Sequence, residues 1–60
     1  MKINKGHYLE ITDRIAVTQV NIENNLRNHP VIEKDKKLQK LIDKAQYQLA
    51  KAYQITGGKI

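Results

Sequence analysis

The stretch that decides the fold is Asp35–Gly57, with the sequence DKKLQKLIDKAQYQLAKAYQITG. Its apolar residues recur every three or four positions, a spacing that places side chains on one face of an α-helix. Asp35 predicts the N-cap, because its carboxylate can accept hydrogen bonds from the free N–H groups of the first turn. Gly57 predicts the glycine that follows the last turn, so the helix is expected at about 36–56. Its apolar face comprises Leu38, Leu41, Ile42, Ala45, Leu49, Ala52 and Tyr53.

Residues 7–28 predict a second amphipathic helix, with Asn4 as a candidate N-cap ahead of it. One narrow apolar stripe is expected to pack on the 36–56 helix and to use the apolar face of that helix fully. The stripe consists of Tyr8, Ile11, Ile15, Ile22 and Leu26. A second apolar group lies well around the helix from the first, and it consists of Leu9, Ala16, Val17 and Val20. In a chain with one other helix, that second group needs another copy or a target protein to cover it.

Pro30 separates the two helical patterns. Proline cannot continue the hydrogen-bond ladder of a helix, and the residue before it is pushed out of the helical region. Residues 29–35 are therefore expected to form a loop, with His29 as a turn residue rather than a ligand, and 57–60 a short tail. The predicted fold is one all-α domain over 1–60, a two-helix antiparallel hairpin that assembles into a four-helix bundle or higher homo-oligomer.

The composition supports association. A chain of 60 residues buries too little surface for a robust core of its own. It has no Cys and only two His, which argues against disulfides and structural metal sites, so neither a metal nor a cofactor is expected. The remaining way to stabilise so small a domain is a homo-oligomer, either a dimer or a tetramer.

The net charge of +5 is concentrated in the second half of the chain. Residues 31–60 hold seven Lys against three acidic residues, which is a net charge of +4. Such an excess favours anionic partners, such as nucleic acid or a nucleotide. No run approaches the ~20 apolar residues that span a bilayer, and the N-terminal MKINKGHY lacks the apolar core of a signal peptide. A cytoplasmic protein without membrane contact is therefore expected.

A lysine stripe on the 36–56 helix is the first candidate site, and it consists of Lys37, Lys40, Lys44 and Lys51. Tyr47 lies in its middle, opposite the apolar face. Lysines can neutralise phosphates and a tyrosine ring can stack on a base, although a solvated face that keeps the protein soluble would have the same pattern. The stripe contains no Arg, so contact with a nucleic-acid backbone without much sequence specificity is expected.

A second cluster contains His7, Glu10, Asp13 and Arg14. A His and a carboxylate three residues apart can share a metal or perform acid–base chemistry, and an exposed salt-bridge cluster has the same spacing. In a further alternative, His7 and Arg14 line a pocket between subunits, where the guanidinium clamps a phosphate or carboxylate. No complete catalytic motif accompanies the cluster, so an enzyme is not expected. Asn residues at 21, 24, 25 and 28 indicate either a polar contact surface or fraying.

Several spaced residues resemble small helical-hairpin proteins of tailed bacteriophages. They are His7, Asp13-Arg14, His29-Pro30, Asp35, Ala45, Leu49, Tyr53-Gln54 and Gly57. The chain departs from that pattern at Lys36, where those proteins have Pro. The resemblance implies a phage accessory or anti-defence factor in the cytoplasm of a host cell. Such small phage proteins include inhibitors of host enzymes, transcription modifiers and proteins that sequester nucleotide immune signals.

Together these observations predict a non-enzymatic, small, basic, oligomeric protein that captures an anionic ligand, either a nucleotide signal or a nucleic-acid backbone. The expected ligand-binding residues are Lys37, Lys40, Lys44, Tyr47, Lys51, Arg14 and His7. The expected oligomer interface is Leu9, Ala16, Val17 and Val20. The alternative is an inhibitor or modifier that docks on a host protein through an exposed apolar helix face.

Overall fold

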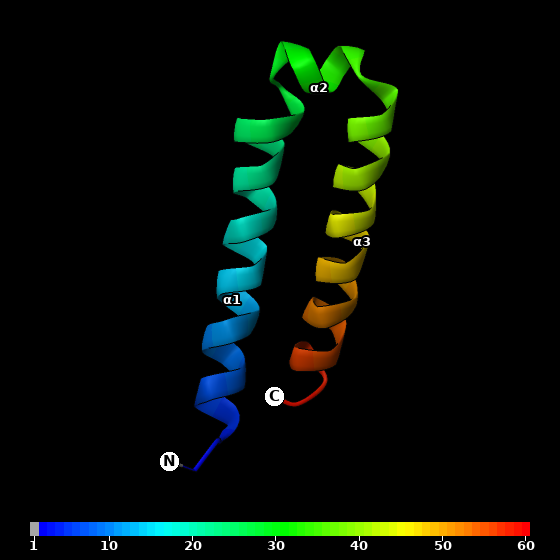
Figure 1. The fold of residues 1–60 in the computed structure, drawn as a ribbon. Coiled ribbons are helices and arrows are strands. Elements are labelled where there is room, and N and C mark those ends of the chain that lie inside the picture. Colours follow the sequence, from blue (N-terminus) through cyan, green and yellow to red (C-terminus); the bar gives the residue numbers. More distant parts are fainter. Residues whose placement is uncertain (1) are drawn as a thin grey trace.

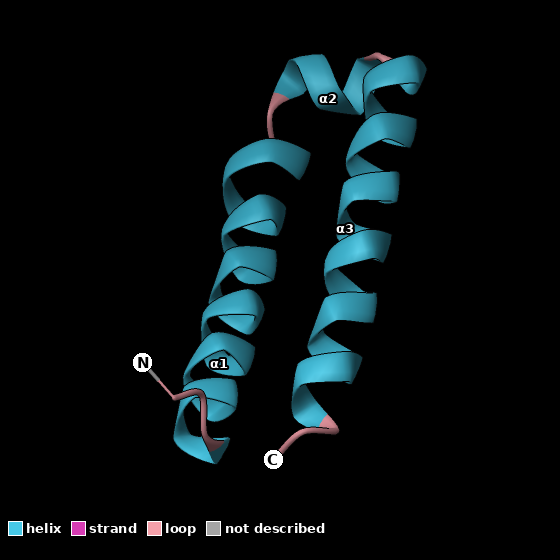
Figure 2. Cartoon of the chain, turned by 60° about the horizontal axis from the view of Figure 1, so that its bottom comes forward, coloured by secondary structure: helices cyan, strands magenta, loops and turns pink. Residues whose placement is uncertain are grey.

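The computed structural model describes residues 2–60, and this part of the chain is all-α, as predicted (Figure 1). Helix α1 (Lys5–Ile22) continues directly into the π-helix η1 (Glu23–Arg27), and α3 (Lys36–Gly57) runs back alongside α1. Figure 2 shows the same pair from below, with both ends of the chain at one end of the molecule. The expected loop over 29–35 is wrong in one respect, because it contains the short helix α2 (Pro30–Lys34).

A reciprocal cap sets the start of α1. The Asn4 side chain accepts a hydrogen bond from the His7 backbone N–H at 3.1 Å, and the Asn4 N–H donates to His7 Nδ1 at 3.0 Å. Each partner satisfies a donor that the first turn of a helix would otherwise leave free. This capping box confirms Asn4 as the N-cap and lets α1 begin at Lys5, two residues before the expected start.

The chain turns through His29 and Asp35, which cap the next two helices. His29 has an extended backbone, and its Nδ1 accepts from the Val31 N–H at 3.2 Å, so it acts as the N-cap of α2. Asp35 is the N-cap of α3 as predicted, since its Oδ1 accepts from Lys37 N at 3.0 Å and from Leu38 N at 3.1 Å. The prediction for Gly57 is wrong, because Gly57 is still helical and Gly58 follows it with a φ of −70°.

The contact between α1 and α3 is polar at its centre. Thr12 is the one buried residue among residues 2–60, with 6% of its surface exposed, and no hydrophobic residue in that range is buried. The Thr12 hydroxyl lies 2.7 Å from Thr56 Oγ1 of α3 and 2.7 Å from the Tyr8 carbonyl oxygen. The expectation that packing on α1 would use the apolar face of α3 fully is therefore wrong: α3 has no buried residue, and Leu41 is 56% exposed.

The predicted stripe on α1 is covered only in part. Tyr8, Ile15 and Ile22 are half-buried, whereas Ile11 and Leu26 are exposed. The polar Thr12 and Gln19 lie in the contact with α3 beside them. No helix within residues 2–60 combines the length and the apolar character that crossing a membrane requires.

Candidate ligand-binding surface

The lysine stripe lies on the exposed side of α3. Its members Lys37, Lys40, Lys44 and Lys51 are all exposed. At a rise of about 1.5 Å per residue, the stripe is roughly 21 Å long. No carboxylate is hydrogen-bonded or ion-paired to any of these four lysines within residues 2–60. Their charge is therefore available to an anion in solution.

Tyr47 is an exposed aromatic residue among these lysines, with 59% of its surface accessible. The Lys51 Nζ lies 5.0 Å from the centroid of the Tyr47 ring, which is within the range of a cation–π contact. This contact holds a positive charge over one side of an aromatic ring. The ring and the ammonium group together form a surface suited to a planar, negatively charged molecule.

Tyr47 also forms one wall of a surface hollow between α3 and the α1–η1 helix. The opposite wall comes from Val20 and Arg27, and Ala50 of α3 lies at the same hollow. The hollow thus joins the lysine stripe of one helix to side chains of the other. Neither helix alone would form it.

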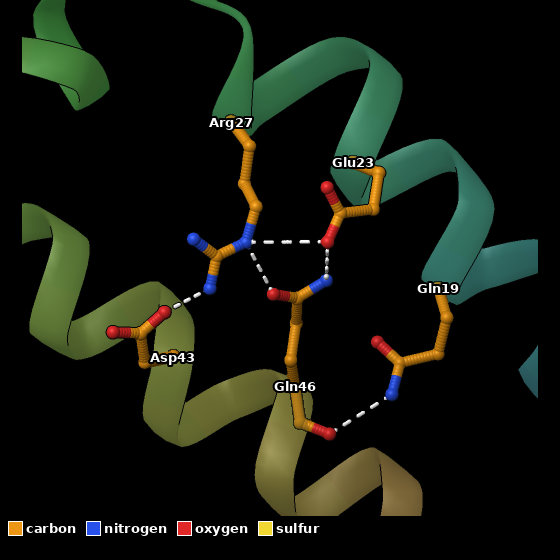
Figure 3. A network of polar contacts seen from close by, with 5 residues as sticks. All are labelled: Gln19, Glu23, Arg27, Asp43 and Gln46. Carbon is orange, nitrogen blue, oxygen red and sulfur yellow. Dashed lines mark hydrogen bonds and ion pairs between the residues drawn. The ribbon is translucent and has the colours of Figure 1, made fainter.

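Four polar side chains line the base of this hollow, and we call them the polar clasp: Glu23, Arg27, Asp43 and Gln46 (Figure 3). Arg27 donates through Nη2 to Asp43 Oδ1 and through Nε to Gln46 Oε1. Its Nε also lies 3.4 Å from Glu23 Oε1, and Gln46 Nε2 donates to that same oxygen at 3.3 Å. With two carboxylates and one guanidinium, the polar clasp carries a formal charge of −1, so an anion in the hollow would depend on the lysines.

The π-helix explains how Arg27 reaches α3. A π-turn contains more residues than an α-turn, so residues after it lag behind the α-helical winding. This lag turns Arg27 toward α3, and only 30% of its side chain is exposed. The Asn pair at 24 and 25 lies inside this π-turn, with both side chains exposed. The polar clasp was not predicted, although the four-residue spacing of Gln19, Glu23 and Arg27 indicates a polar line along one helix face.

Gln19 links α1 to α3 beside the same hollow. Its Nε2 donates to the Gln46 carbonyl oxygen at 2.9 Å (Figure 3). Its Oε1 is buried and has no hydrogen-bond partner within residues 2–60. A buried amide oxygen without a donor costs about 1–3 kcal/mol, which offsets part of the gain from this link.

The structure does not bring His7 and Arg14 to the lysine stripe of the same chain. His7 is engaged in the cap of α1, at the end of the molecule opposite the Lys37 end of α3. Arg14 forms an exposed ion pair with Glu10, with Nη2 and Oε1 3.0 Å apart, and it lines a separate hollow with Val17. The salt-bridge interpretation of this cluster fits these contacts. No group of three or more His, Asp or Glu side chains within residues 2–60 is placed to hold a metal.

The four residues expected at an oligomer interface lie on different surfaces. Leu9, Val17 and Val20 are exposed, in agreement with an uncovered apolar group. Ala16 is half-buried and lines a hollow between α1 and α3 together with Tyr53. Ala16 therefore belongs to the contact within the chain, and the exposed apolar group on this side is reduced to three residues.

Comparison with known proteins adds no further constraint. No protein-family model matches the chain, and neither a curated protein nor a solved structure shows significant similarity to it. The resemblance to phage hairpin proteins therefore stays a prediction.

Proposed function

We propose that the protein is a non-enzymatic binding protein that captures a phosphate-bearing nucleotide ligand on the lysine stripe and Tyr47. In this proposal α1 and α3 act as a two-helix antiparallel hairpin that assembles into a four-helix bundle or higher homo-oligomer. The observation that carries the proposal is the exposed Tyr47 ring with the Lys51 Nζ 5.0 Å from its centroid, on a helix face whose lysines have no acidic partner within residues 2–60.

Each part of this surface suits one part of a nucleotide. Lysine ammonium groups neutralise phosphates, and an exposed aromatic ring contributes about 1–3 kcal/mol per stacked base. The hollow beside Tyr47 gives a stacked base a second wall, made by Val20 and Arg27 of the other helix. This combination favours a ligand with both a base and phosphates over an inorganic anion.

Two sources share this chemistry: a short nucleic-acid strand and a small nucleotide signal. Fluorescent oligonucleotides and fluorescent cyclic dinucleotides should be titrated separately at low and at high salt. A strand contacts several lysines and releases several counterions, so its affinity should fall steeply with salt. A small nucleotide should show weak salt dependence. Failure of both probes to bind at low salt would refute the proposal.

Variants of Tyr47 and of the lysine stripe separate specific contacts from general charge. Tyr47→Phe keeps the ring and should retain most of the binding, whereas Tyr47→Ala should weaken it about fivefold to 150-fold, from ~1–3 kcal/mol of stacking. Lys44→Gln should weaken binding more than Lys59→Gln, which removes the same charge outside the stripe. Equal effects of the two lysine variants would indicate nonspecific attraction to a basic protein.

A second candidate function is docking on another protein, and the exposed Leu9, Val17 and Val20 of α1 favour it. An apolar helix face of this kind can lie in a groove of a target protein. The resemblance to phage proteins supports an accessory or anti-defence setting for either role. Val17→Glu should abolish target binding under this alternative and leave nucleotide binding unchanged.

A further inference from the structure

The pair formed by α1 and α3 has two broad sides, and they differ in charge. Val20, Asp43 and Tyr47 line one hollow, so they mark one side of the pair. Each residue of an α-helix is turned by about 100° from the one before it. On this basis a second set of side chains lies on the other broad side of the pair, across the contact of Thr12 and Gln19 from the hollow beside Tyr47. We call this set the charge-free face, and it comprises Ile11, Ile15, Ile22, Leu38, Ile42 and Leu49.

The charge-free face has no Lys, Arg, Asp or Glu in the helix sectors that form it. On α1 the neighbouring position in this sector is Asn25, and on α3 the neighbouring positions are Ala45 and Ala52. Thr18 lies outside the face, at a hollow that it lines with Asp13 and Arg14. The side with Tyr47, in contrast, includes Arg27 and the two carboxylates of the polar clasp. Depletion of charge is a feature of the core of protein–protein interfaces.

This face is only partly covered within one chain. Ile11 is 43% exposed, and the other five members are half-buried. No hydrophobic residue within residues 2–60 is buried, although burial of apolar surface is the main force that offsets the conformational entropy lost on folding. A single chain therefore has little of the principal source of stability of a folded domain, and the half-buried apolar side chains of the charge-free face still have surface that a partner could cover.

We propose that the charge-free face is a homodimer interface, and that its occupant is a second copy of this chain. A suitable partner must present an apolar surface without charges along nearly the whole length of α3. A second copy related by a two-fold axis presents such a surface, because each copy contributes the same face. The small Ala45 and Ala52 let the partner helices approach closely.

The size of this side suits a stable dimer. The molecule extends 44 × 17 × 16 Å, so an interface along the full length of one broad side can cover at most roughly 750 Å² of projected area. A standard interface buries about 800 Å² on each partner. Pairing two copies would place four helices around one apolar core, as in a four-helix bundle. Because Tyr47, the lysine stripe and Val17 lie outside this interface, the dimer would carry two separate basic surfaces, one on each chain.

The inference concerns self-association and does not depend on the identity of the ligand. Equilibrium sedimentation of the full chain should give twice the 6.9 kDa chain mass. Ile11→Glu should raise the dimer dissociation constant by a factor of about ten or more, because it would bury an unpaired charge at the interface. Val17→Glu is the matched control: it places the same charge on an exposed residue of α1 outside the face and should leave the mass unchanged.

A second variant and a second measurement keep the test decisive if Ile11→Glu does not fold. Leu41 lies at the edge of the charge-free face and is 56% exposed, close to the 59% of Val17, so Leu41→Glu disturbs the single chain little and should also weaken the dimer. The melting temperature of the unchanged protein should rise with protein concentration, since association stabilises the folded state. A monomeric mass with a concentration-independent melting temperature would overturn the proposal. So would a dimer that Val17→Glu dissociates and Ile11→Glu does not.

Discussion

The hydroxyl pair of Thr12 and Thr56 offers the sharpest test of how α1 meets α3. The two Oγ1 atoms lie 2.7 Å apart at the one buried position among residues 2–60. Replacement of either residue by Val keeps the shape of the side chain and removes the hydroxyl. Each hydroxyl also lies near a carbonyl of its own helix, at 2.7 Å from Tyr8 O and 3.1 Å from Tyr53 O, so neither single substitution leaves a hydroxyl without a partner.

Each single variant should therefore lose one interhelical hydrogen bond, which lowers the free energy of unfolding by about 0.5–1.5 kcal/mol. In the double variant Thr12→Val with Thr56→Val, the free energy of unfolding should fall by no more than it does in one single variant, because two methyl groups replace the hydroxyl pair. The expected coupling free energy is then about 0.5–1.5 kcal/mol. For a domain of this size, 1 kcal/mol corresponds to a shift in melting temperature of roughly 4–8 °C.

Urea unfolding followed by circular dichroism, at one fixed protein concentration, measures this cycle. Thr18→Val provides the control, because the Thr18 hydroxyl donates to the Arg14 carbonyl at 2.8 Å in the same way and faces solvent instead of α3. Its effect should stay within about 0.5 kcal/mol. Additive effects of the two single variants, with a coupling below about 0.3 kcal/mol, would show that these hydroxyls do not interact and would refute the proposed alignment of the helices.

Three further predictions concern the clasp, the cap and the basic surface. Arg27→Met should lower the free energy of unfolding by about 1–2 kcal/mol and weaken anion binding near Tyr47, because it removes the cation between two carboxylates; thermal melts and ligand titrations check both effects. Asn4→Ala should cost about 1 kcal/mol through loss of the capping box, whereas Lys2→Ala should change the melt little. One ligand should bind per chain, since each chain carries its own basic surface. Calorimetric titration with whichever probe binds, the oligonucleotide or the cyclic dinucleotide, measures this stoichiometry. A value of one ligand per dimer would contradict the prediction.

The helical elements could be predicted from local features. Asn4 and Asp35 act as N-caps because their side chains satisfy N–H groups within three residues, which is information that a short sequence contains. The end of the first helical pattern before Pro30 has a local cause as well, because proline lacks the N–H group that a continuing helix needs. The error at Gly57 was also local in origin, since a glycine permits a left-handed cap but does not require one.

The candidate surface was predicted only in part. Spacing along α3 is enough to place the lysine stripe and Tyr47 on one exposed side of the helix. The hollow beside Tyr47 could not be predicted, because its opposite wall comes from Val20 and Arg27 of the other helix. In addition, the Arg27 side chain points toward α3 because of the π-turn. A π-turn departs from the regular α-helical spacing on which the prediction was based.

The sequence by itself determined that the chain is helical, that Asn4 and Asp35 cap its two long helices, and that positive charge gathers on one side of α3. These properties follow from periodicity and from contacts between residues three or four positions apart. Only the tertiary structure decided which faces meet. The contacts Thr12–Thr56 and Gln19–Gln46 join residues 44 and 27 positions apart, and they depend on how each helix is rotated about its own axis. Periodicity defines the apolar and polar sides of a helix but not that rotation. Here the rotation places Thr12 and Gln19 in the contact and leaves Ile11, Leu26 and Leu41 exposed.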